Sequence, residues 1–414
     1  MKLLDTKNLV RDAIAGITVA IVALPLALGF GITSGMSAAA GLTTAILAGF
    51  VAALLGGSRF QVSGPTGAMT VVLVPIIHSY GIKAIPLLGL MAGLIVIVLA
   101  LIKAGPFINR IPWPVVEGFT VGIAAVIALQ QIPLALGIAK HAGDRSIPIA
   151  VGTITDALKS GIQWQTLALV VLTILIKFIF PQLWKKTHLT FHIPASAVAI
   201  VVVTLVLHVF SIKSSTIGTI PRSIGTWSGG LLDFGLIQHL LLPAAMIAAL
   251  CAIESLLSAR VADSMAHVPI TEHFNTNKEL LGQGVATVVA SLFGGMPATG
   301  AIARTSVNVR AHAHSKYASV FHALVLLLVA LVAAPLVSAI PSAAIAGVLI
   351  GTSYRILNPV SIMESLRTTK ADAAVLVVTA LTTLAIDLIW GIGIGITLFL
   401  ALNYGKRNAK NASI

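Results

Sequence analysis

The chain has 414 residues, of which 57% are hydrophobic and only 9% are charged, and its mean hydropathy is +1.01. A soluble chain carries about 25% charged residues, so this composition excludes a soluble globular protein and indicates an integral membrane protein. The net charge of +13 would suit nucleic acid as a partner. The basic residues instead follow a membrane-topology pattern, and we expect no nucleic-acid partner.

The apolar runs are continuous rather than alternating, which predicts an all-α membrane protein rather than a β-barrel. Many runs reach the roughly 20 residues that a helix needs to cross a bilayer. We predict fourteen spans, near residues 13–31, 36–55, 66–79, 84–102, 113–137, 164–180, 192–210, 239–258, 280–293, 299–313, 319–338, 342–356, 371–386 and 389–404.

An even number of spans places both termini on the same side of the membrane. Only a few basic residues then fall on the opposite side, namely Lys83, Lys140, Arg145, Lys159, Lys213 and Arg222. The positive-inside rule therefore predicts that both termini are cytoplasmic and that the protein lies in the cytoplasmic (inner) membrane.

The spans divide into two predicted halves. Residues 1–210 hold seven spans and residues 239–404 hold the other seven, while the polar segment 211–238 reads as a linker and 405–414 as a short cytoplasmic tail. An odd number of spans in each half inverts the second half in the membrane. Inverted repeats of this kind place the substrate near the midplane, between the halves.

A short phrase occurs once in each half. The first copy reads AALLGG at 52–57 and PTGA at 65–68, and the second reads ASLFGG at 290–295 and PATGA at 297–301. Each copy is the end of an apolar helix, a Gly-Gly break and a new start. Two interrupted segments at matching places point to a transport site. The alternative is that these are ordinary Gly/Pro kinks between packed helices. In that case the two copies would match in register only by coincidence.

The helices that follow the breaks are too short to cross the membrane. A helix from Thr66 to Tyr80 extends about 22 Å, against a hydrocarbon core of about 30 Å, and Thr299 to Ala313 is equally short. Each therefore begins inside the membrane with free N–H groups and a positive helix end. Two such ends at one spot suit a small anion. The predicted substrate-binding residues are Thr66, Gly67, Ala68, Gly300, Ala301 and Ile302.

The strongest motif is NKELLGQG at 277–284, followed by FGGMPATGAIART at 293–305, with supporting matches GPTG at 64–67, PWPVVEGF at 112–119 and IESLL at 253–257. In these motifs the chain resembles the membrane domain of the sulfate permease (SulP) family of anion transporters. The resemblance implies fourteen helices in a seven-plus-seven inverted repeat, with a core domain and a gate domain. It also implies an anion site between the starts of helices three and ten, and a homodimer.

The chain departs from the family at its end and in its first helix. Most members carry a cytoplasmic STAS domain after the last helix, whereas this chain ends at Ile414, so we expect no STAS domain here. Leu26 stands where many relatives have Gln. Phe30 matches an aromatic position near the family's site, so the resemblance adds Phe30 to the substrate-binding residues.

Glu254 lies in an apolar run, where a carboxylate costs several kcal/mol unless it is paired or protonated. We predict that Glu254 couples transport by carrying H⁺ or binding Na⁺, and its position in the family supports this. Ser258, one turn further on, would supply a second oxygen ligand if the ion is Na⁺. The alternative is a carboxylate that reaches the cytoplasm or pairs with Arg260 or Arg304. No other cofactor is expected.

Arg304 lies roughly 7–8 Å from the start of the tenth helix, inside the bilayer. An intramembrane arginine is a functional candidate by default. We predict that Arg304 attracts the anion, balances Glu254, or does both; a purely structural ion pair is the alternative.

Together these features predict a secondary active transporter of sulfate, bicarbonate or a carboxylate, coupled to H⁺ or Na⁺ by symport with alternating access. An uncoupled exchanger or channel on the same fold stays open, as does a nucleobase carrier, which would be expected to place carboxylates at the base site. An enzyme is not expected, because the chain has no phosphate-binding loop, nucleophile elbow or zinc motif. Its one cysteine, Cys251, excludes an internal disulfide and a Cys-rich metal site.

Overall fold

The chain forms helices that gather into two compact units. Unit 1 comprises Met1–Asn109 and Gln163–Val348, and unit 2 comprises Arg110–Ile162 and Leu349–Ile414. Each unit therefore combines segments from both predicted halves, whose own boundaries stay a prediction. The structure, a computed structural model, describes residues 6–143, 145–186, 193–212, 214–357, 359–386 and 388–411.

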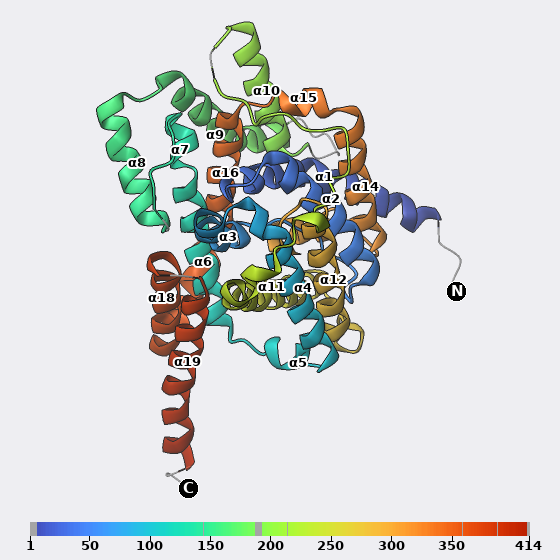
Figure 1. Ribbon diagram of the computed structural model, residues 1–414. Coiled ribbons are helices and arrows are strands. Elements are labelled where there is room, and N and C mark those ends of the chain that lie inside the picture. The colour runs from blue at the N-terminus through green and yellow to red at the C-terminus, as the bar shows by residue number, and fades with distance from the viewer. Residues whose placement is uncertain are drawn as a thin grey trace. The chain divides into compact units, whose positions relative to one another are not determined.

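Unit 1 holds most of the helices and one pair of very short strands (Figure 1). Its strands are β1 (Ser63–Gly64) and β2 (Thr299–Gly300). Its helices are α1 (Thr6–Thr33), α2 (Ala38–Leu55), α3 (Gly67–Tyr80), α4 (Ile85–Leu101), α5 (Gly105–Ile108), α9 (Trp164–Lys185), α10 (Ala195–Val209), α11 (Ile237–Met265), α12 (Thr276–Leu292), α13 (Ile302–Arg310), α14 (Tyr317–Val332), α15 (Ala334–Ser338) and the first part of α16 (Ser342–Ile356).

Among its described residues, unit 2 holds the end of α16 and six further helices. These are α6 (Trp113–Gln130), α7 (Ile132–Leu136), α8 (Ser146–Ser160), α17 (Pro359–Thr368), α18 (Lys370–Ala385) and α19 (Leu388–Asn411). Helices α18 and α19 form a hairpin, drawn in red in Figure 1. Helix α6 packs on α18 at a glycine, since a Cβ at Gly118 would lie 2.4 Å from the carbonyl oxygen of Leu376.

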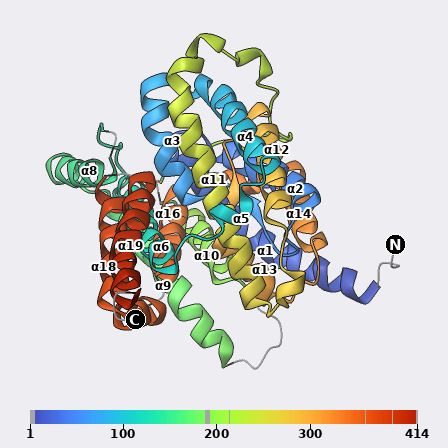
Figure 2. The same cartoon turned by 90° about the horizontal axis from the view of Figure 1, so that it is seen from below.

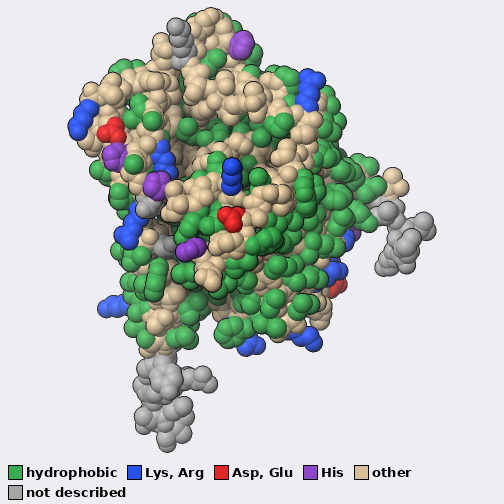
Figure 3. Space-filling model, viewed as in Figure 1, with side chains coloured by type: hydrophobic (Ala, Val, Ile, Leu, Met, Phe, Trp, Pro, Cys, Tyr) green, Lys and Arg blue, Asp and Glu red, His purple; other side chains and the backbone are tan. Residues whose placement is uncertain are grey.

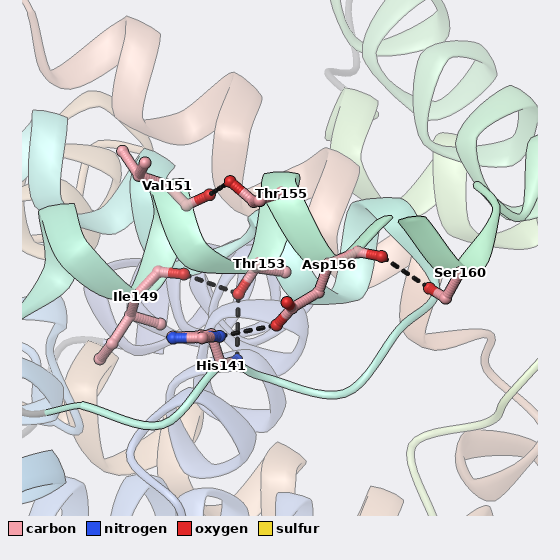
Figure 4. A network of polar contacts seen from close by, with 7 residues as sticks. All are labelled: His141, Ile149, Val151, Thr153, Thr155, Asp156 and Ser160. Carbon is pink, nitrogen blue, oxygen red and sulfur yellow. Dashed lines mark hydrogen bonds and ion pairs between the residues drawn. The ribbon is translucent and has the colours of Figure 1, made fainter. Parts of the chain in front are cut away.

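Within unit 2, the segment after α7 is held against α8 by one polar network (Figure 4). His141 Nδ1 lies 2.6 Å from Asp156 Oδ2, and the backbone N–H of His141 donates to Thr153 Oγ1 at 3.1 Å. The imidazole also covers Gly152, where a Cβ would lie 2.3 Å from the ring. These contacts fix a surface connection and belong to no candidate site.

Small residues let the helices of unit 1 approach closely. An alanine cluster joins α2, α12 and the residue before β2, and is formed by Ala48, Ala52, Ala286, Ala290 and Ala298. Where α4 crosses α12, a Cβ at Gly93 would lie 2.7 Å from Gly284 O, and a Cβ at Gly284 would lie 2.8 Å from Gly93 O. In membranes, such small-residue contacts hold helices together by close van der Waals packing. Figure 2 shows α11 beside α4 and α12.

Many large hydrophobic side chains are exposed on the surface, as a lipid environment requires. In the described part of the chain, six helices are long and apolar enough to cross a membrane: Thr6–Thr33, Ala38–Leu55, Ile82–Leu101, Trp113–Leu136, Trp164–Lys185 and Phe234–Met265. Shorter apolar helices accompany them, so the total of fourteen spans stays a prediction. Figure 3 shows hydrophobic side chains over much of one face, with few charged ones.

The predicted linker is tied to unit 1 rather than extended. The Ile217 N–H donates to Ile340 O at 3.1 Å, and the Ser342 N–H donates to Ser215 O at 2.9 Å. Further along, the Ser228 N–H donates to Leu292 O at 2.7 Å. The segment therefore runs across the start of α16 and reaches the end of α12.

The helix after the second break begins later than the sequence predicts. The sequence predicts a helix from residue 299, whereas Thr299 and Gly300 form β2 and the helix begins at Ile302. Extended residues here pair with β1, which satisfies backbone groups that a membrane interior would leave without partners. Helix α12 ends at Leu292, and Gly294 adopts φ +79°, a left-handed conformation that favours glycine.

Candidate functional site

The two copies of the repeated phrase meet in space. Strands β1 and β2 pair antiparallel, with Ser63 opposite Gly300 and Gly64 opposite Thr299. Each strand leads directly into a short helix, α3 or α13. The prediction that two short helices start at one place inside the protein is therefore confirmed.

The start of α3 is capped by its own side chain. Thr66 is the N-cap residue, and its Oγ1 accepts the backbone N–H of Met69 at 3.4 Å. Thr70 Oγ1 donates back to Gly67 O at 2.6 Å. Gly67 and Ala68, two predicted substrate-binding residues, lie buried in this first turn.

The start of α13 lacks such a cap. Its N-cap residue is Ala301, which has no side-chain oxygen, although its own N–H donates to Val62 O at 3.0 Å. Ile302 and Ala303 follow in the first turn and are half-buried. The first N–H groups of a helix have no intrahelical partner, so the start of α13 presents donors and a positive helix end.

Glu254 joins the two starts. This residue of α11 is 7% exposed, and its Oε2 accepts hydrogen bonds from Thr66 Oγ1 at 3.0 Å and Thr299 Oγ1 at 2.7 Å. The two threonine hydroxyls are themselves 3.4 Å apart. One carboxylate oxygen therefore binds the same residue type from both copies of the phrase.

Arg304, in α13, is 1% exposed. Its Nη2 donates to Pro65 O at 2.5 Å, so the side chain reaches the residues just before α3. Its Nη1 has no hydrogen-bond partner, and in the described chain the guanidinium forms no ion pair with Glu254. A Cβ at Gly64 would lie 2.6 Å from Nη1, so glycine there leaves room for the guanidinium.

Ser258 lies one turn after Glu254 in α11, and its role as a Na⁺ ligand stays a prediction. Its hydroxyl donates to Thr305 Oγ1 at 3.1 Å, and Thr305 also accepts the N–H of Val62. The hydrogen bonds of the Glu254 carboxylate go to Thr66 and Thr299. Ser255, to which the sequence assigns no role, accepts the N–H of Gly300 at 3.0 Å and so holds β2 against α11.

Phe30 lies in α1 and is 7% exposed. Helix α1 packs on both α3 and α13, so the aromatic residue belongs to the same helix group as the two starts.

Several polar residues around β1 had no role in the sequence interpretation. Glu279 and Gln283 lie within a motif quoted for the family, which was a usable signal; Gln61, Asn308 and His322 carried none. Gln61 is 6% exposed, its amide has no hydrogen-bond partner within the described residues, and a Cβ at Gly300 would lie 1.9 Å from its Nε2. Asn308 donates to Phe60 O at 2.8 Å, and His322 is fully buried in α14.

No metal centre is formed by the described residues. Nowhere among them do three His, Cys, Asp or Glu side chains gather closely enough to hold a metal ion. Cys251 is buried as a thiol, and its Sγ lies 3.2 Å from Ala298 O.

Comparison with known proteins gives one consistent answer. Residues 9–379 match the sulfate permease family. The putative sulfate transporter YvdB of Bacillus subtilis is 36% identical over 393 residues, covering 94% of this chain and 72% of that protein. The bicarbonate transporter BicA of Synechocystis sp. is 34% identical over 415 residues, covering 97% and 71% of the two chains.

The fold agrees with solved structures. The transmembrane domain of a cyanobacterial bicarbonate transporter BicA matches with a TM-score of 0.83 and 31% identity, over 94% of this chain and 98% of that one. A structure of SLC26A9 matches with a TM-score of 0.84 at 16% identity, over 97% of this chain and 66% of that one, which shows a shared fold. The chain therefore belongs to the sulfate permease family and is an integral membrane transporter rather than an enzyme.

Proposed function

We propose that the chain is a secondary active transporter of a small anion, coupled to H⁺ or Na⁺ by symport and working by alternating access. The observation that carries this proposal is the single oxygen of Glu254 that binds Thr66 and Thr299 at once. It joins a titratable carboxylate to the two helix starts that would hold the anion. The names of the relatives, which include sulfate and bicarbonate transporters, support an inorganic anion as substrate.

The anion would bind at the start of α13. The N–H groups of Ile302 and Ala303, in the first turn of α13, have no intrahelical acceptor. The buried Arg304 offers an Nη1 without a hydrogen-bond partner among the described residues. An anion accepts hydrogen bonds from all of these donors, and a buried guanidinium binds oxyanions with particular strength. Thr66 and the backbone at Gly67 would supply the opposite wall.

Coupling follows from charge. An ionised Glu254 repels an anion that enters beside it, since the threonine hydroxyls hold the carboxylate at the same helix starts. A proton or Na⁺ on Glu254 removes that repulsion. By linkage, the bound anion then strengthens cation binding by the same factor. For Na⁺, oxygen ligands would come from Glu254 and from the lone pairs of Ser258, whose hydrogen is directed to Thr305.

The test is uptake into proteoliposomes with labelled sulfate, bicarbonate and fumarate, each under an imposed H⁺ or Na⁺ gradient. We expect one of these anions to accumulate above its external concentration with one cation gradient and not with the other. Anion flux that ignores both gradients would indicate an uncoupled exchanger or channel instead. Uptake of labelled uracil without any anion uptake would indicate a nucleobase carrier.

We also propose a homodimer in the cytoplasmic membrane with both termini on the cytoplasmic side. The distribution of basic residues supports the orientation. A cysteine introduced at Thr6 in a Cys251→Ser chain should resist a membrane-impermeant thiol reagent in intact cells and react after permeabilisation. Reaction in intact cells would reverse the topology.

A further inference from the structure

A second buried carboxylate holds the first break from outside the candidate site. Glu279, in the first turn of α12, is 1% exposed. Its Oε2 accepts the backbone N–H groups of Gly57 and Ser58, both at 2.8 Å. Its Oε1 accepts Nε2 of Gln283 at 2.9 Å. Hydrogen bonds to a carboxylate are about twice as strong as neutral ones, so the two backbone contacts anchor the turn after α2 firmly.

The glycines of the break bring this carboxylate into contact with the backbone. A Cβ at Gly56 would lie 2.9 Å from Glu279 Oε2, and a Cβ at Gly57 would lie 2.2 Å from Asn275 O. On the opposite side, a Cβ at Gly282 would lie 2.5 Å from the nitrogen of Gly56. The Gly-Gly break is therefore shaped by the helix that precedes the other break.

Gln283 extends the contact to the strand. Its Nε2, which donates to Glu279, also donates to Ser63 Oγ at 2.6 Å. Ser63 belongs to β1, which leads through Pro65 to the N-cap of α3. The carboxylate thus holds the chain at both ends of the segment between α2 and α3.

We propose that Glu279 is a positioning residue for the anion site, which rests on the proposed function. By fixing the break and β1, Glu279 sets where Thr66 meets Glu254 and Thr299. Without the carboxylate, the N–H groups of Gly57 and Ser58 lose their acceptor and Gln283 loses one of its two partners. The start of α3 then moves relative to α13, although neither Glu279 nor Gln283 touches the substrate.

The first experiment reports how close the starts of α3 and α13 lie, and it does not depend on transport. Thr66→Cys and Thr299→Cys are introduced into a Cys251→Ser chain, which removes the only native cysteine. The native hydroxyls are 3.4 Å apart, so we expect oxidation to join the two thiols. After denaturation, a maleimide-linked polymer labels free thiols only, so chains that stay unlabelled contain the disulfide.

Adding Glu279→Ala should lower the rate at which this disulfide forms at least about tenfold, since the loss of a hydrogen bond to a charged group corresponds to that factor or more. The matched control is Glu272→Gln, which changes a carboxylate that is 53% exposed and pairs with Arg59 just after the same break. We expect the control to leave the rate unchanged. A native rate in Glu279→Ala would overturn the proposal.

The second experiment measures KM and kcat for anion uptake in the chain with native threonines. Glu279→Ala should raise KM at least about tenfold with a smaller change in kcat. Glu279→Gln should restore most of the affinity, because its oxygen accepts both N–H groups and a flipped Gln283 amide then accepts from residue 279 and Ser63. If Glu279→Gln were no better than Glu279→Ala, positioning through these hydrogen bonds would be wrong.

A third variant keeps the test decisive if Glu279→Ala does not fold. Gln283→Leu leaves the carboxylate on Gly57 and Ser58 and removes the hydrogen bonds of the amide to Glu279 and Ser63. It should slow the disulfide by a smaller factor than Glu279→Ala, and an unchanged rate would contradict the connection to β1. Since the disulfide forms whether or not anions are transported, failure of the proposed function and failure of the positioning role remain distinct.

Discussion

The two breaks share a sequence phrase but differ in the polar side chains that bind them and in the capping of the helices that follow. The first is held by a charged side chain, Glu279 of α12, and its helix start is capped by Thr66. The second is held by a neutral one, since the Met296 N–H donates to Thr44 Oγ1 of α2 at 2.8 Å. Its helix start at Ala301 has no cap and carries Arg304 one turn on.

Each break is thus secured by the helix that leads into the other one. Helices α2 and α12 pack against each other through small residues, which brings Thr44 to the second break and Glu279 to the first. The difference lies in which helix start keeps free donors. A capped start supports the fold, whereas an uncapped start has hydrogen bonds to offer a ligand.

The largest expected effect comes from the residue shared by both starts. Glu254→Gln keeps the side-chain volume and one oxygen for the threonine hydroxyls but removes the titratable charge. We expect gradient-driven accumulation to fall about a hundredfold, near the upper end of coupling between two sites, with the protein still folded. The measurement is uptake in proteoliposomes with and without a cation gradient. Normal cation-driven uptake would remove Glu254 from the coupling mechanism.

The next largest effect tests the positive charge that only the start of α13 carries. Arg304→Ala removes the guanidinium and the unpartnered donor from the second start, so anion affinity should fall about tenfold to a hundredfold. Titration of the purified protein with the transported anion measures this directly. Lys83→Ala, at an exposed residue in the turn just before α4, serves as a control for net charge. Equal affinity in Arg304→Ala and the native chain would place the anion elsewhere.

A smaller effect distinguishes the two threonines. Thr66→Val loses both the bond to Glu254 and the cap of α3, whereas Thr299→Val loses contacts only within the site. Removing an N-cap costs about 1 kcal/mol. We therefore expect both variants to weaken coupling but Thr66→Val to show the lower thermal stability in detergent. Lower thermal stability of Thr299→Val than of Thr66→Val would contradict the capping role of Thr66.

The smallest effect tests the uncapped start directly. Ala301→Ser places a hydroxyl at the N-cap of α13, where it can accept the first-turn N–H groups. Thermal stability should rise by about 0.5–2 kcal/mol, while anion affinity should fall severalfold because the donors are already engaged. Thermal unfolding and anion titration on the same preparation check both signs. Higher affinity together with higher stability would show that these donors do not bind the anion.

The sequence alone identified much of the site because its signals are local. The Gly-Gly breaks, the shortness of the restarted helices, and the ionisable residues Glu254 and Arg304 within apolar runs can each be read from a few neighbouring positions. The contacts of Ser258 and Ser255 could not be read in this way. Both lie on α11 near Glu254, and only the position of β2 and Thr305 decides that Ser255 holds Gly300 while Ser258 turns to Thr305.

What the sequence by itself determined is the membrane class, the internal repetition and the two interrupted helices, because hydropathy and glycine placement act over short stretches of chain. Only the tertiary structure decided that Gly64 pairs with Thr299, that one oxygen of Glu254 serves both threonines, and that Glu279 reaches the opposite break. These contacts join residues far apart in the chain. Their geometry depends on how closely α2, α11 and α12 pack, which no single segment encodes.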